Sequence, residues 1–383
     1  MNVPRLLLNP LTLLTSVKSA VNMNQSTTDR DTRVSRCLDD QIAASKYPGV
    51  QYVIVNSNRR LYEYDGGFSD VERRIPMEPT TTMMGYSMTK TFTAVAVLQL
   101  VERGKVSLEE CVLHYMPSIP YGSYVTVREL LSQTSGIPNP LPLRWVHPAS
   151  EGTSFDEAAA LQTVMAAHPR LSFTPGSQYA YSNISYWLLG KIIERARGEP
   201  YEAYMERNVF APLGLCAAQA GFTIADRSRQ AKGYLARRSF MNLLKRFLVD
   251  GKLIGKNEGR WVHILDNYVN GPAFGGLVAT ARGISVFLQD QLAERSVLLS
   301  PQTLRLLYSQ QRAAEQGLVA MTLGWHIGKL DGYRYYYKEG GGGGYHGEMR
   351  IYPERNLGSV IMVNETSSSS VQSQDTADRE FLR

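Results

Sequence analysis

A serine and a lysine three residues apart form the strongest chemical signal in the sequence. Ser87 and Lys90 directly precede the apolar stretch TFTAVAVLQLVERG, which predicts a buried helix. Residues i and i+3 of a helix share a face, so the Lys90 amine can approach the Ser87 hydroxyl. A serine hydroxyl needs a base to act as a nucleophile, and burial or a second cation lowers the pKa of a lysine enough for that role. The helix N-terminus also directs backbone N–H groups at an oxyanion formed on Ser87.

A second candidate group is the tyrosine of Tyr181-Ser182-Asn183, which follows a Pro-Gly turn and precedes an expected helix. A tyrosine beside two lysines should have a lowered pKa, because both cations favour the phenolate. Tyr181 can then take the proton of Ser87 and return it to a leaving group. The side-chain carbonyl of Asn183 can hold Lys90 in place. The alternative is an ordinary turn whose polar residues cap the helix.

A third candidate is Lys338-Glu339 with the five glycines that follow it, residues 340–344. A glycine run is usually a flexible linker. Here the strand-like segments RYYYKE and EMRIYP flank it, and glycine in a strand often marks a close approach to the backbone. We therefore expect an edge strand that hydrogen-bonds a substrate and donates an N–H group to an oxyanion.

Strand-like segments come from both ends of the chain, and the middle is mostly helical. We expect a helix over 30–46, after which VQYVIVN and RRLYEYD predict a hairpin around 56–58. Near the far end, GEMRIYP and GSVIMVN predict a second hairpin around 354–356. The pattern favours a mixed sheet closed by the two chain ends, with a helical insertion.

These elements divide the chain into an extension, two domains and a tail. The expected parts are a weakly ordered N-terminal extension (1–29), a discontinuous sheet domain (30–86 and 276–364), a helical domain (87–275) and a loosely held polar C-terminal tail (365–383).

One segment of the helical domain, residues 237–260, is strongly basic. It contains seven Lys or Arg residues against two acidic ones. Its apolar residues have helical spacing: Phe240, Leu243, Leu244, Phe247 and Leu248. The segment predicts either an ordinary surface helix or a cap over the site whose apolar face lines an acyl pocket.

Composition excludes several classes of protein. The chain has 383 residues, 43% of them hydrophobic, and its net charge of +6 is too small to indicate nucleic-acid binding. The three cysteines lie far apart and no histidine pair has metal-ligand spacing, so we expect no disulfide framework and no metal.

The leucine-rich N-terminus is too short to span a bilayer and lacks a clean signal-peptide core. We expect a cytoplasmic protein without an integral membrane segment, with a secreted or periplasmic one as the alternative.

The three motifs in this order resemble the serine β-lactamase and penicillin-binding-protein superfamily. The resemblance is closest to its class C-like branch, which includes the family VIII carboxylesterases. Connecting segments such as LLSQTSGIPN, GPAFGGLVATARG and GEMRIYPE are also similar to those of that branch. The resemblance implies an α+β fold of the β-lactamase/transpeptidase type, in which helices flank an antiparallel sheet, a helical domain is added and the site lies between them.

The resemblance also implies a role for each candidate residue. Ser87 would be the acylated nucleophile, with Lys90 as its partner. Tyr181 would be the general base, Asn183 would orient Lys90, and Lys338 would supply positive charge. No cofactor is implied.

The third motif departs from the pattern of the β-lactamases. The resemblance places the oxyanion hole at the backbone N–H groups of Ser87 and Gly341. β-Lactamases of this group carry Lys-Thr-Gly, whose hydroxyl helps bind a substrate carboxylate, whereas this chain has Glu339 before Gly340. A glutamate there repels a carboxylate in a partly dry site, and neutral esters suffer no such penalty. His346 follows the glycines and is expected to line the site.

These features favour a serine hydrolase that cleaves small carboxylic esters through an acyl-enzyme. A β-lactamase or a D-amino-acid peptidase is the alternative within the same chemistry. A non-catalytic ligand or peptidoglycan sensor with the same fold is the alternative from another class. The intact motifs favour an enzyme, and the sequence indicates no oligomeric state.

Overall fold

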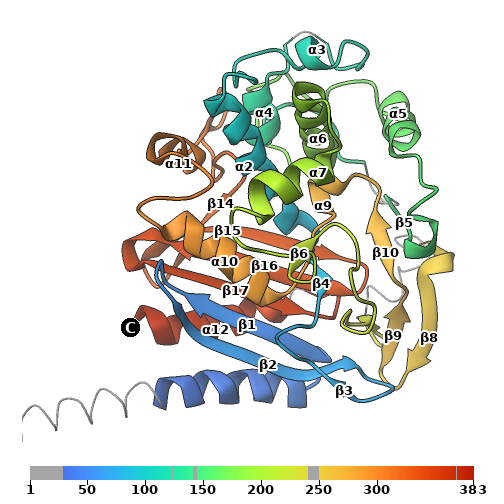
Figure 1. Cartoon of the computed structure of the whole chain (residues 1–383), viewed down its shortest axis with the longest axis vertical. Helices are drawn as coiled ribbons and strands as arrows, with labels where there is room; N and C mark the ends of the chain where they lie inside the picture. The colour runs from blue at the N-terminus through green and yellow to red at the C-terminus, as the bar shows by residue number, and fades with distance from the viewer. Residues whose placement is uncertain (1–28, 123, 141–144, 240–249, 368) are drawn as a thin grey trace, which may run out of the picture.

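A seven-stranded antiparallel sheet forms the centre of the computed structural model, which describes residues 29–122, 124–140, 145–239, 250–367 and 369–383 (Figure 1). In spatial order the strands are β14 (His326–Leu330), β15 (Tyr333–Gly342), β16 (Tyr345–Tyr352), β17 (Leu357–Val363), β1 (Gly49–Val55), β2 (Arg60–Asp70) and β3 (Ile75–Pro76). Both expected hairpins are confirmed, since β1 pairs with β2 and β16 with β17. β1 also pairs with β17, so the two ends of the chain close one sheet. The expectation of a mixed sheet is wrong, because every neighbouring pair is antiparallel.

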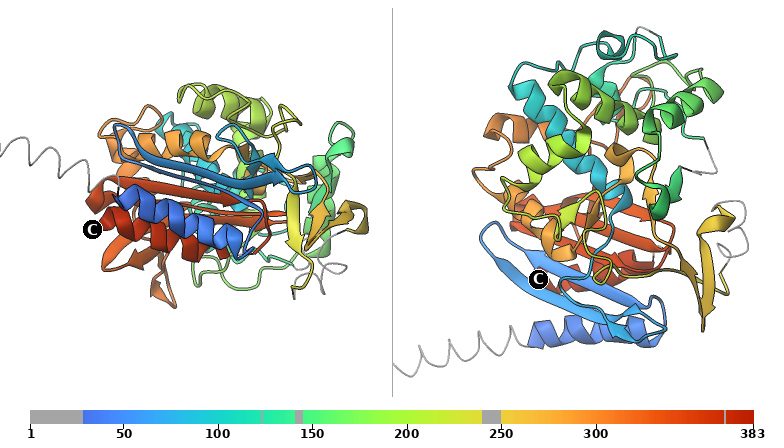
Figure 2. Two further views of the ribbon diagram at one scale, coloured as in Figure 1. Left: turned by 90° about the horizontal axis from the view of Figure 1, so that it is seen from below. Right: turned by 45° about the vertical axis from the view of Figure 1, so that its right-hand side comes forward.

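Both faces of the sheet are covered, which explains why β1 and β17 are buried along their whole length and largely apolar. Along β1, Tyr52 and Ile54 point to one face, whereas Val53 and Val55 point to the other. The first face carries the helix over residues 29–43 and α12 (Ser369–Leu382), which lie side by side in Figure 2. The second face carries α10 (Ala281–Leu292) and the bulk of the helices.

The C-terminal segment forms a packed helix, so the expectation of a loosely held polar tail is wrong. Small, polar and aromatic side chains recur at helical spacing on its buried face: Ser370, Gln374, Ala377, Asp378, Phe381 and Leu382. Asp378 is fully buried and accepts hydrogen bonds from Tyr52 (2.8 Å) and Tyr352 (2.7 Å). Its carboxylate also lies 3.3 Å from the buried guanidinium of Arg350. Partners supplied by the sheet therefore allow polar residues to form the packing face of α12.

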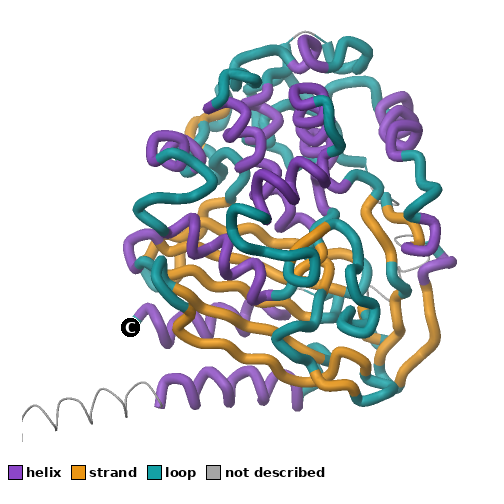
Figure 3. The backbone as a smooth tube through the Cα atoms, viewed as in Figure 1, coloured by secondary structure: helices purple, strands orange, loops and turns teal. Residues whose placement is uncertain are grey.

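The remaining helices gather on the other side of the sheet (Figure 3). They are α2 (Thr89–Glu102), α3 (Val112–Tyr115), α4 (Val127–Leu131), α5 (Glu157–Ala167), α6 (Asn183–Arg197), α7 (Tyr201–Met205), α9 (Pro272–Gly275) and α11 (Pro301–Leu307). Short one-turn and π-helical segments are η1 (Tyr86–Met88), η2 (Ala149–Glu151), η3 (Glu206–Phe210), η4 (Gly251–Leu253) and η5 (Pro353–Arg355). The central helix α2 is buried from Thr89 to Leu100, as its mostly apolar sequence predicted.

The expected helical domain also contains strands. They are β5 (Val146–Pro148), β6 (Ala220–Gly221), β7 (Gly233–Ala236), β8 (Ile254–Glu258), β9 (Trp261–Ile264) and β10 (Asn267–Val269). Outside that domain lie β4 (Met83–Met84), β11 (Val278–Ala279), β12 (Arg312–Ala313) and β13 (Gly317–Leu318). The apolar residues of the basic segment, 240–249, lie outside the described residues, as does the extension 1–28. Within the described part of the basic segment, 250–258 forms η4 and β8 and no long helix.

None of the helices in the described ranges has the length and hydrophobicity that a membrane span requires.

Candidate active site

The serine of the first motif lies in the turn that leads into the buried helix α2. Tyr86, directly before it, has a left-handed backbone conformation with φ of 42°. Such a conformation is strained for a residue with a bulky side chain. The Tyr86 hydroxyl donates to the carbonyl oxygen of Gly343 at 2.9 Å. This contact ties the turn of Ser87 to the glycine-rich strand.

The hydroxyl of Ser87 lies between two candidate proton carriers. Its Oγ atom is 2.6 Å from the Tyr181 hydroxyl and 3.0 Å from Lys90 Nζ. Tyr181 directly precedes Ser182, whose side chain caps α6 by accepting from the N–H of Ser185. Capping and chemistry thus share one segment, in which Tyr181 contacts Ser87, Asn183 contacts Lys90 and Ser182 caps the helix.

Lys90 has two further neighbours, and both can only accept hydrogen bonds. Its Nζ atom lies 2.7 Å from Asn183 Oδ1 and 2.6 Å from the backbone carbonyl oxygen of Phe274. Burial, and then the charge of Lys338, lower the pKa of Lys90 well below its usual range. The neutral amine has two N–H groups for the two carbonyl oxygens, which leaves its lone pair for the Ser87 hydroxyl. The arrangement therefore presents a base to the serine.

Burial raises the pKa of Tyr181, so the expectation of a lowered pKa is wrong. The two lysines do lie beside it, with Lys90 Nζ 4.9 Å and Lys338 Nζ 4.8 Å from its ring centroid. Desolvation of the phenolate outweighs the effect of the two lysines. The nearby negative charge of Glu339 raises the pKa of Tyr181 further. Tyr181 is a neutral phenol in the resting site and can donate its proton to Ser87 Oγ.

Asn139 holds the amide of Asn183, a contact that the sequence did not indicate. Its Oδ1 atom accepts from the backbone N–H of Asn183 at 3.1 Å and from the side-chain Nδ2 at 3.2 Å. This orientation turns Asn183 Oδ1 towards Lys90. The only available signal was that Asn139 ends the family-like segment LLSQTSGIPN.

His326 is a second residue that the sequence did not single out. It begins β14, and its Nε2 atom lies 3.3 Å from Lys338 Nζ. Burial and the charge of Lys338 lower the pKa of His326 well below its usual range, so the ring is neutral and accepts from the lysine. Burial also lowers the pKa of Lys338 to about 7. No spacing rule connects a histidine and a lysine on neighbouring strands with this register.

The first three residues of the glycine run, 340–342, belong to strand β15, as expected, and the backbone there packs against the turn of Ser87. A Cβ atom at Gly340 would lie 2.1 Å from the carbonyl oxygen of Gly85 and 3.0 Å from the N atom of Ser87. A Cβ atom at Gly342 would lie 2.6 Å from the ring of Tyr86. Glycine is therefore required sterically here.

β15 is an edge strand only along its second half. β14 pairs with Tyr333–Tyr337, whereas among the described residues Lys338–Gly342 pair with β16 alone. The exposed Gly341 lies on this free edge, one residue beyond the close contact with Ser87. A substrate can thus extend along the free edge.

Glu339 and His346 contact each other across β15 and β16. His346 Nε2 lies 2.6 Å from Glu339 Oε1, and His346 Nδ1 lies 2.7 Å from Ser370 Oγ. The histidine is buried behind the glutamate, so it borders the site through Glu339. The hydrogen bond from His346 lowers the pKa of Glu339, which is therefore an anion.

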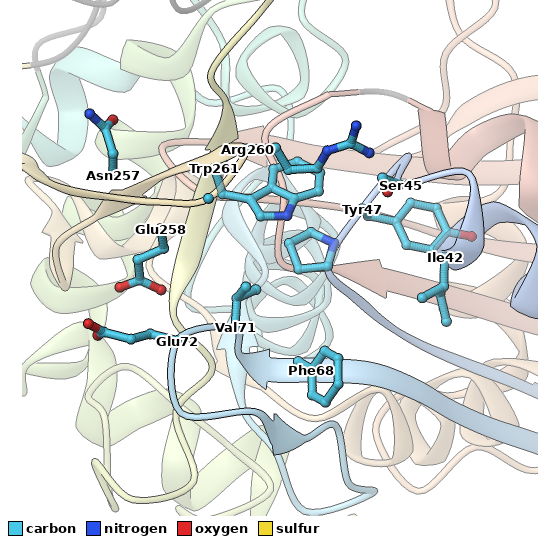
Figure 4. A pocket seen from close by; sticks show the side chains of 12 residues that line it. Ile42, Ser45, Tyr47, Phe68, Val71, Glu72, Asn257, Glu258, Arg260 and Trp261 are labelled. Carbon is cyan, nitrogen blue, oxygen red and sulfur yellow. The ribbon is translucent and has the colours of Figure 1, made fainter.

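A separate pocket of about 600 Å³ contains none of these residues (Figure 4). It lies between the end of helix 29–43, the end of β2 and the hairpin of β8 and β9. Beside it, the carboxylates of Asp70, Glu72 and Glu258 come together. Lys232 Nζ lies 3.1, 3.4 and 2.8 Å from them, so an ammonium group already lies among the three carboxylates and offsets part of their charge.

Comparison with known proteins identifies similar folds and sequences. A family model described as "Beta-lactamase" matches residues 34–383. The protein flp of Staphylococcus aureus (strain COL) is 27% identical over 215 residues, which cover 54% of this chain and 42% of that protein. This chain thus spans less than half the length of that relative.

Two solved structures share the fold over most of their length. The octameric penicillin-binding protein homologue from Pyrococcus abyssi has a TM-score of 0.74 at 24% identity, covering 92% of this chain and 77% of that one. The D-amino acid amidase from Ochrobactrum anthropi SV3 has a TM-score of 0.75 at 20% identity, covering 92% and 99%. The expected β-lactamase/transpeptidase-like fold is confirmed.

Proposed function

The chain belongs to the beta-lactamase family, and from that premise we propose that it is a serine hydrolase that cleaves small carboxylic esters through an acyl-enzyme on Ser87. One observation carries the proposal. The Ser87 hydroxyl lies within hydrogen-bonding distance of both Lys90, whose pKa is lowered, and Tyr181, whose pKa is raised. A base and an acid with pKa values pushed apart are what acyl transfer requires.

Acylation begins with the lone pair of neutral Lys90. The amine takes the proton of Ser87 while Oγ attacks the ester carbonyl carbon. The new Oγ–C bond forms as the carbonyl π electrons move onto oxygen, which gives a tetrahedral oxyanion. Asn183 and the Phe274 carbonyl hold the amine through its two N–H groups, and both then stabilise the ammonium that forms.

The oxyanion needs hydrogen-bond donors placed before the reaction. We assign this role to the backbone N–H groups of Ser87 and Gly341. The support is the close packing of β15 on the turn of Ser87, which brings the strand next to the Ser87 N atom. Lys338 adds positive charge at the same end of the strand when it is protonated.

Collapse of the intermediate breaks the bond to the leaving alcohol. Tyr181 donates its phenolic proton to the departing oxygen and is reprotonated from the Lys90 ammonium, which lies 4.9 Å from the ring centroid. Water then attacks the acyl-enzyme by the same route in reverse, with Lys90 as the base. The sequence of steps returns each group to its starting protonation state.

Glu339 supports an ester over a β-lactam as the substrate. Its anionic carboxylate stands where the β-lactamases of this group have a threonine, and it repels the carboxylate that penicillins carry. A β-lactamase or D-amino-acid peptidase is the second candidate. Because the fold is similar to that of a D-amino acid amidase, this second candidate includes hydrolysis of amides.

The test uses a chromogenic butyrate ester, a chromogenic cephalosporin and a fluorophosphonate probe on wild type and Ser87→Ala. We expect ester turnover, one covalent label per chain, and loss of both in the variant. Turnover of the cephalosporin alone would favour a β-lactamase. Binding without Ser87-dependent turnover or labelling would indicate a sensor.

A further inference from the structure

The negative charge of Glu339 is fixed at the free edge of β15. Its side chain is 46% exposed, whereas His346, which donates to Oε1, is 4% exposed. On the far side of the ring, His346 Nδ1 lies 2.7 Å from the hydroxyl of Ser370, which fixes the ring between Ser370 and Glu339. Buried groups of β16 and α12 therefore hold one carboxylate oxygen in place.

In the described part of the chain, the other carboxylate oxygen of Glu339, Oε2, has no hydrogen-bond donor. Since Oε1 is anchored and the side chain is partly open to solvent, Oε2 is available to a bound molecule.

Lys338 and Arg350 help to lower the pKa of Glu339 through their charge, after the larger effect of His346, but both make their direct contacts elsewhere. Lys338 leaves β15 on the opposite face, where its amino group contacts His326 and the ring of Tyr181. Arg350 is fully buried and pairs with three other carboxylates: Glu348, Asp375 and Asp378. Among the described residues, His346 is thus the group that contacts the Glu339 carboxylate directly, and the Oε2 atom stays open on the free edge of β15.

Glu339 is also close to the reacting atoms. It adjoins Lys338 and Gly340, and the latter packs against the Ser87 turn. Its charge acts on Tyr181, whose pKa it raises. A substrate that extends along Lys338–Gly342 from Ser87 would lie on the same strand edge as Glu339.

We propose that Glu339 makes the site selective for esters that carry a positively charged amine close to the scissile bond, such as esters of amino acids or of short amino-substituted acids. This inference rests on the proposed ester hydrolysis and names the substrate class within it. The ammonium binds Oε2, while His346 keeps Oε1 in place. Anionic acyl groups are rejected by the same charge.

The experiment compares three acyl groups of similar size on one chromogenic alcohol: 4-ammoniobutyrate, valerate and succinate. For wild type we expect kcat/KM for the ammonium ester to exceed that for valerate by about fivefold, the factor that a partly exposed ion pair supplies. We expect the succinate ester to react more slowly than valerate. The preference should shrink as the salt concentration rises, because the carboxylate is partly exposed.

The variant Glu339→Gln should lose most of the ammonium preference, measured as the ratio of the two kcat/KM values. Glu354→Gln is the matched control, because it removes one exposed carboxylate in the turn after β16 and should keep the ratio. A second series of esters carries the ammonium on the alcohol and acetate as the acyl group. It shows whether Glu339 binds the acyl side or the alcohol side of the substrate.

The outcomes separate the two proposals. If wild type hydrolyses valerate through Ser87 and shows no ammonium preference in either series, the assignment of Glu339 is overturned and ester hydrolysis stands. If no ester is hydrolysed, the proposed function itself fails. The wild-type ratios and their salt dependence decide the question even if Glu339→Gln does not fold.

Discussion

Lys90 Nζ lies 3.0 Å from Ser87 Oγ, and its other close neighbours, Asn183 Oδ1 and the carbonyl oxygen of Phe274, can only accept hydrogen bonds. Because burial and the charge of Lys338 lower the pKa of Lys90, its amine can be neutral here and accept the proton of Ser87. Lys90→Arg keeps a positive charge at every accessible pH and cannot take a proton. We expect Lys90→Arg and Lys90→Met each to lower kcat/KM by about a hundredfold to ten-thousandfold, as loss of a general base does. Lys329→Met, on the exposed part of β14, is the control, and activity retained in Lys90→Arg would exclude Lys90 as the base.

The pKa of Lys338, which burial lowers to about 7, predicts a basic limb in the pH profile. The group is charged below this pH and loses its charge as the pH rises through it. If the charge assists the oxyanion, kcat/KM should decline above about pH 7 in wild type. Lys338→Arg should move the decline to higher pH, since a guanidinium stays protonated. An identical profile in this variant would mean that another group controls the limb.

His326 should affect the pH at which activity declines on the basic side of the profile, because it contacts Lys338. Its neutral Nε2 atom accepts from Lys338 and so favours the charged lysine. His326→Leu removes the acceptor, and we expect the basic limb to shift to lower pH by up to about one unit. His326→Gln offers a carbonyl oxygen and should restore part of the shift. A loss of activity without any shift, equal in both variants, would indicate a purely structural histidine.

Gly340→Ala should disrupt the site without removing any polar group. The added Cβ atom would lie 2.1 Å from the carbonyl oxygen of Gly85. Neither atom can rotate away, because the oxygen belongs to the backbone and the backbone fixes the Cβ position. We expect loss of most ester turnover and of fluorophosphonate labelling, because β15 and the Ser87 turn must separate. Gly251→Ala is the control, since nothing lies near its added Cβ atom. Normal labelling in Gly340→Ala would argue against a tightly packed oxyanion hole.

Asp378 should be a major contributor to stability. Asp378→Ala leaves the buried Arg350 with one partner fewer and frees two tyrosine hydroxyls. Removing one member of a buried ion pair costs about 3–5 kcal/mol in the free energy of unfolding. Urea denaturation measures this loss, with Thr376→Ala on the exposed face of α12 as the control. A cost no larger than that of the control would mean that α12 is weakly attached, as the sequence had suggested.

The sequence determined the elements that carry the chemistry, because their signals are local. The spacing of Ser87 and Lys90 before an apolar helix, and the alternating segments on both sides of the glycine run, follow directly from backbone periodicity. The family resemblance then gave the antiparallel sheet, where the pattern alone had suggested a mixed one. Pairing between the two chain ends was also expected, since strands occur only near both termini in that pattern.

Tertiary structure decided everything that depends on a partner distant in sequence. The backbone carbonyl of Phe274 has no sequence signature, and Asn139 and His326 become informative only when their loop and strand lie beside Asn183 and Lys338. The pKa of Tyr181 rises because the fold desolvates it, and the types of its neighbours alone predicted the opposite direction. The polar face of α12 packs because Arg350, 28 residues before Asp378, is buried opposite it. Burial and long-range pairing change both the charge state of a side chain and the surface on which it can lie, and neither is encoded in local spacing.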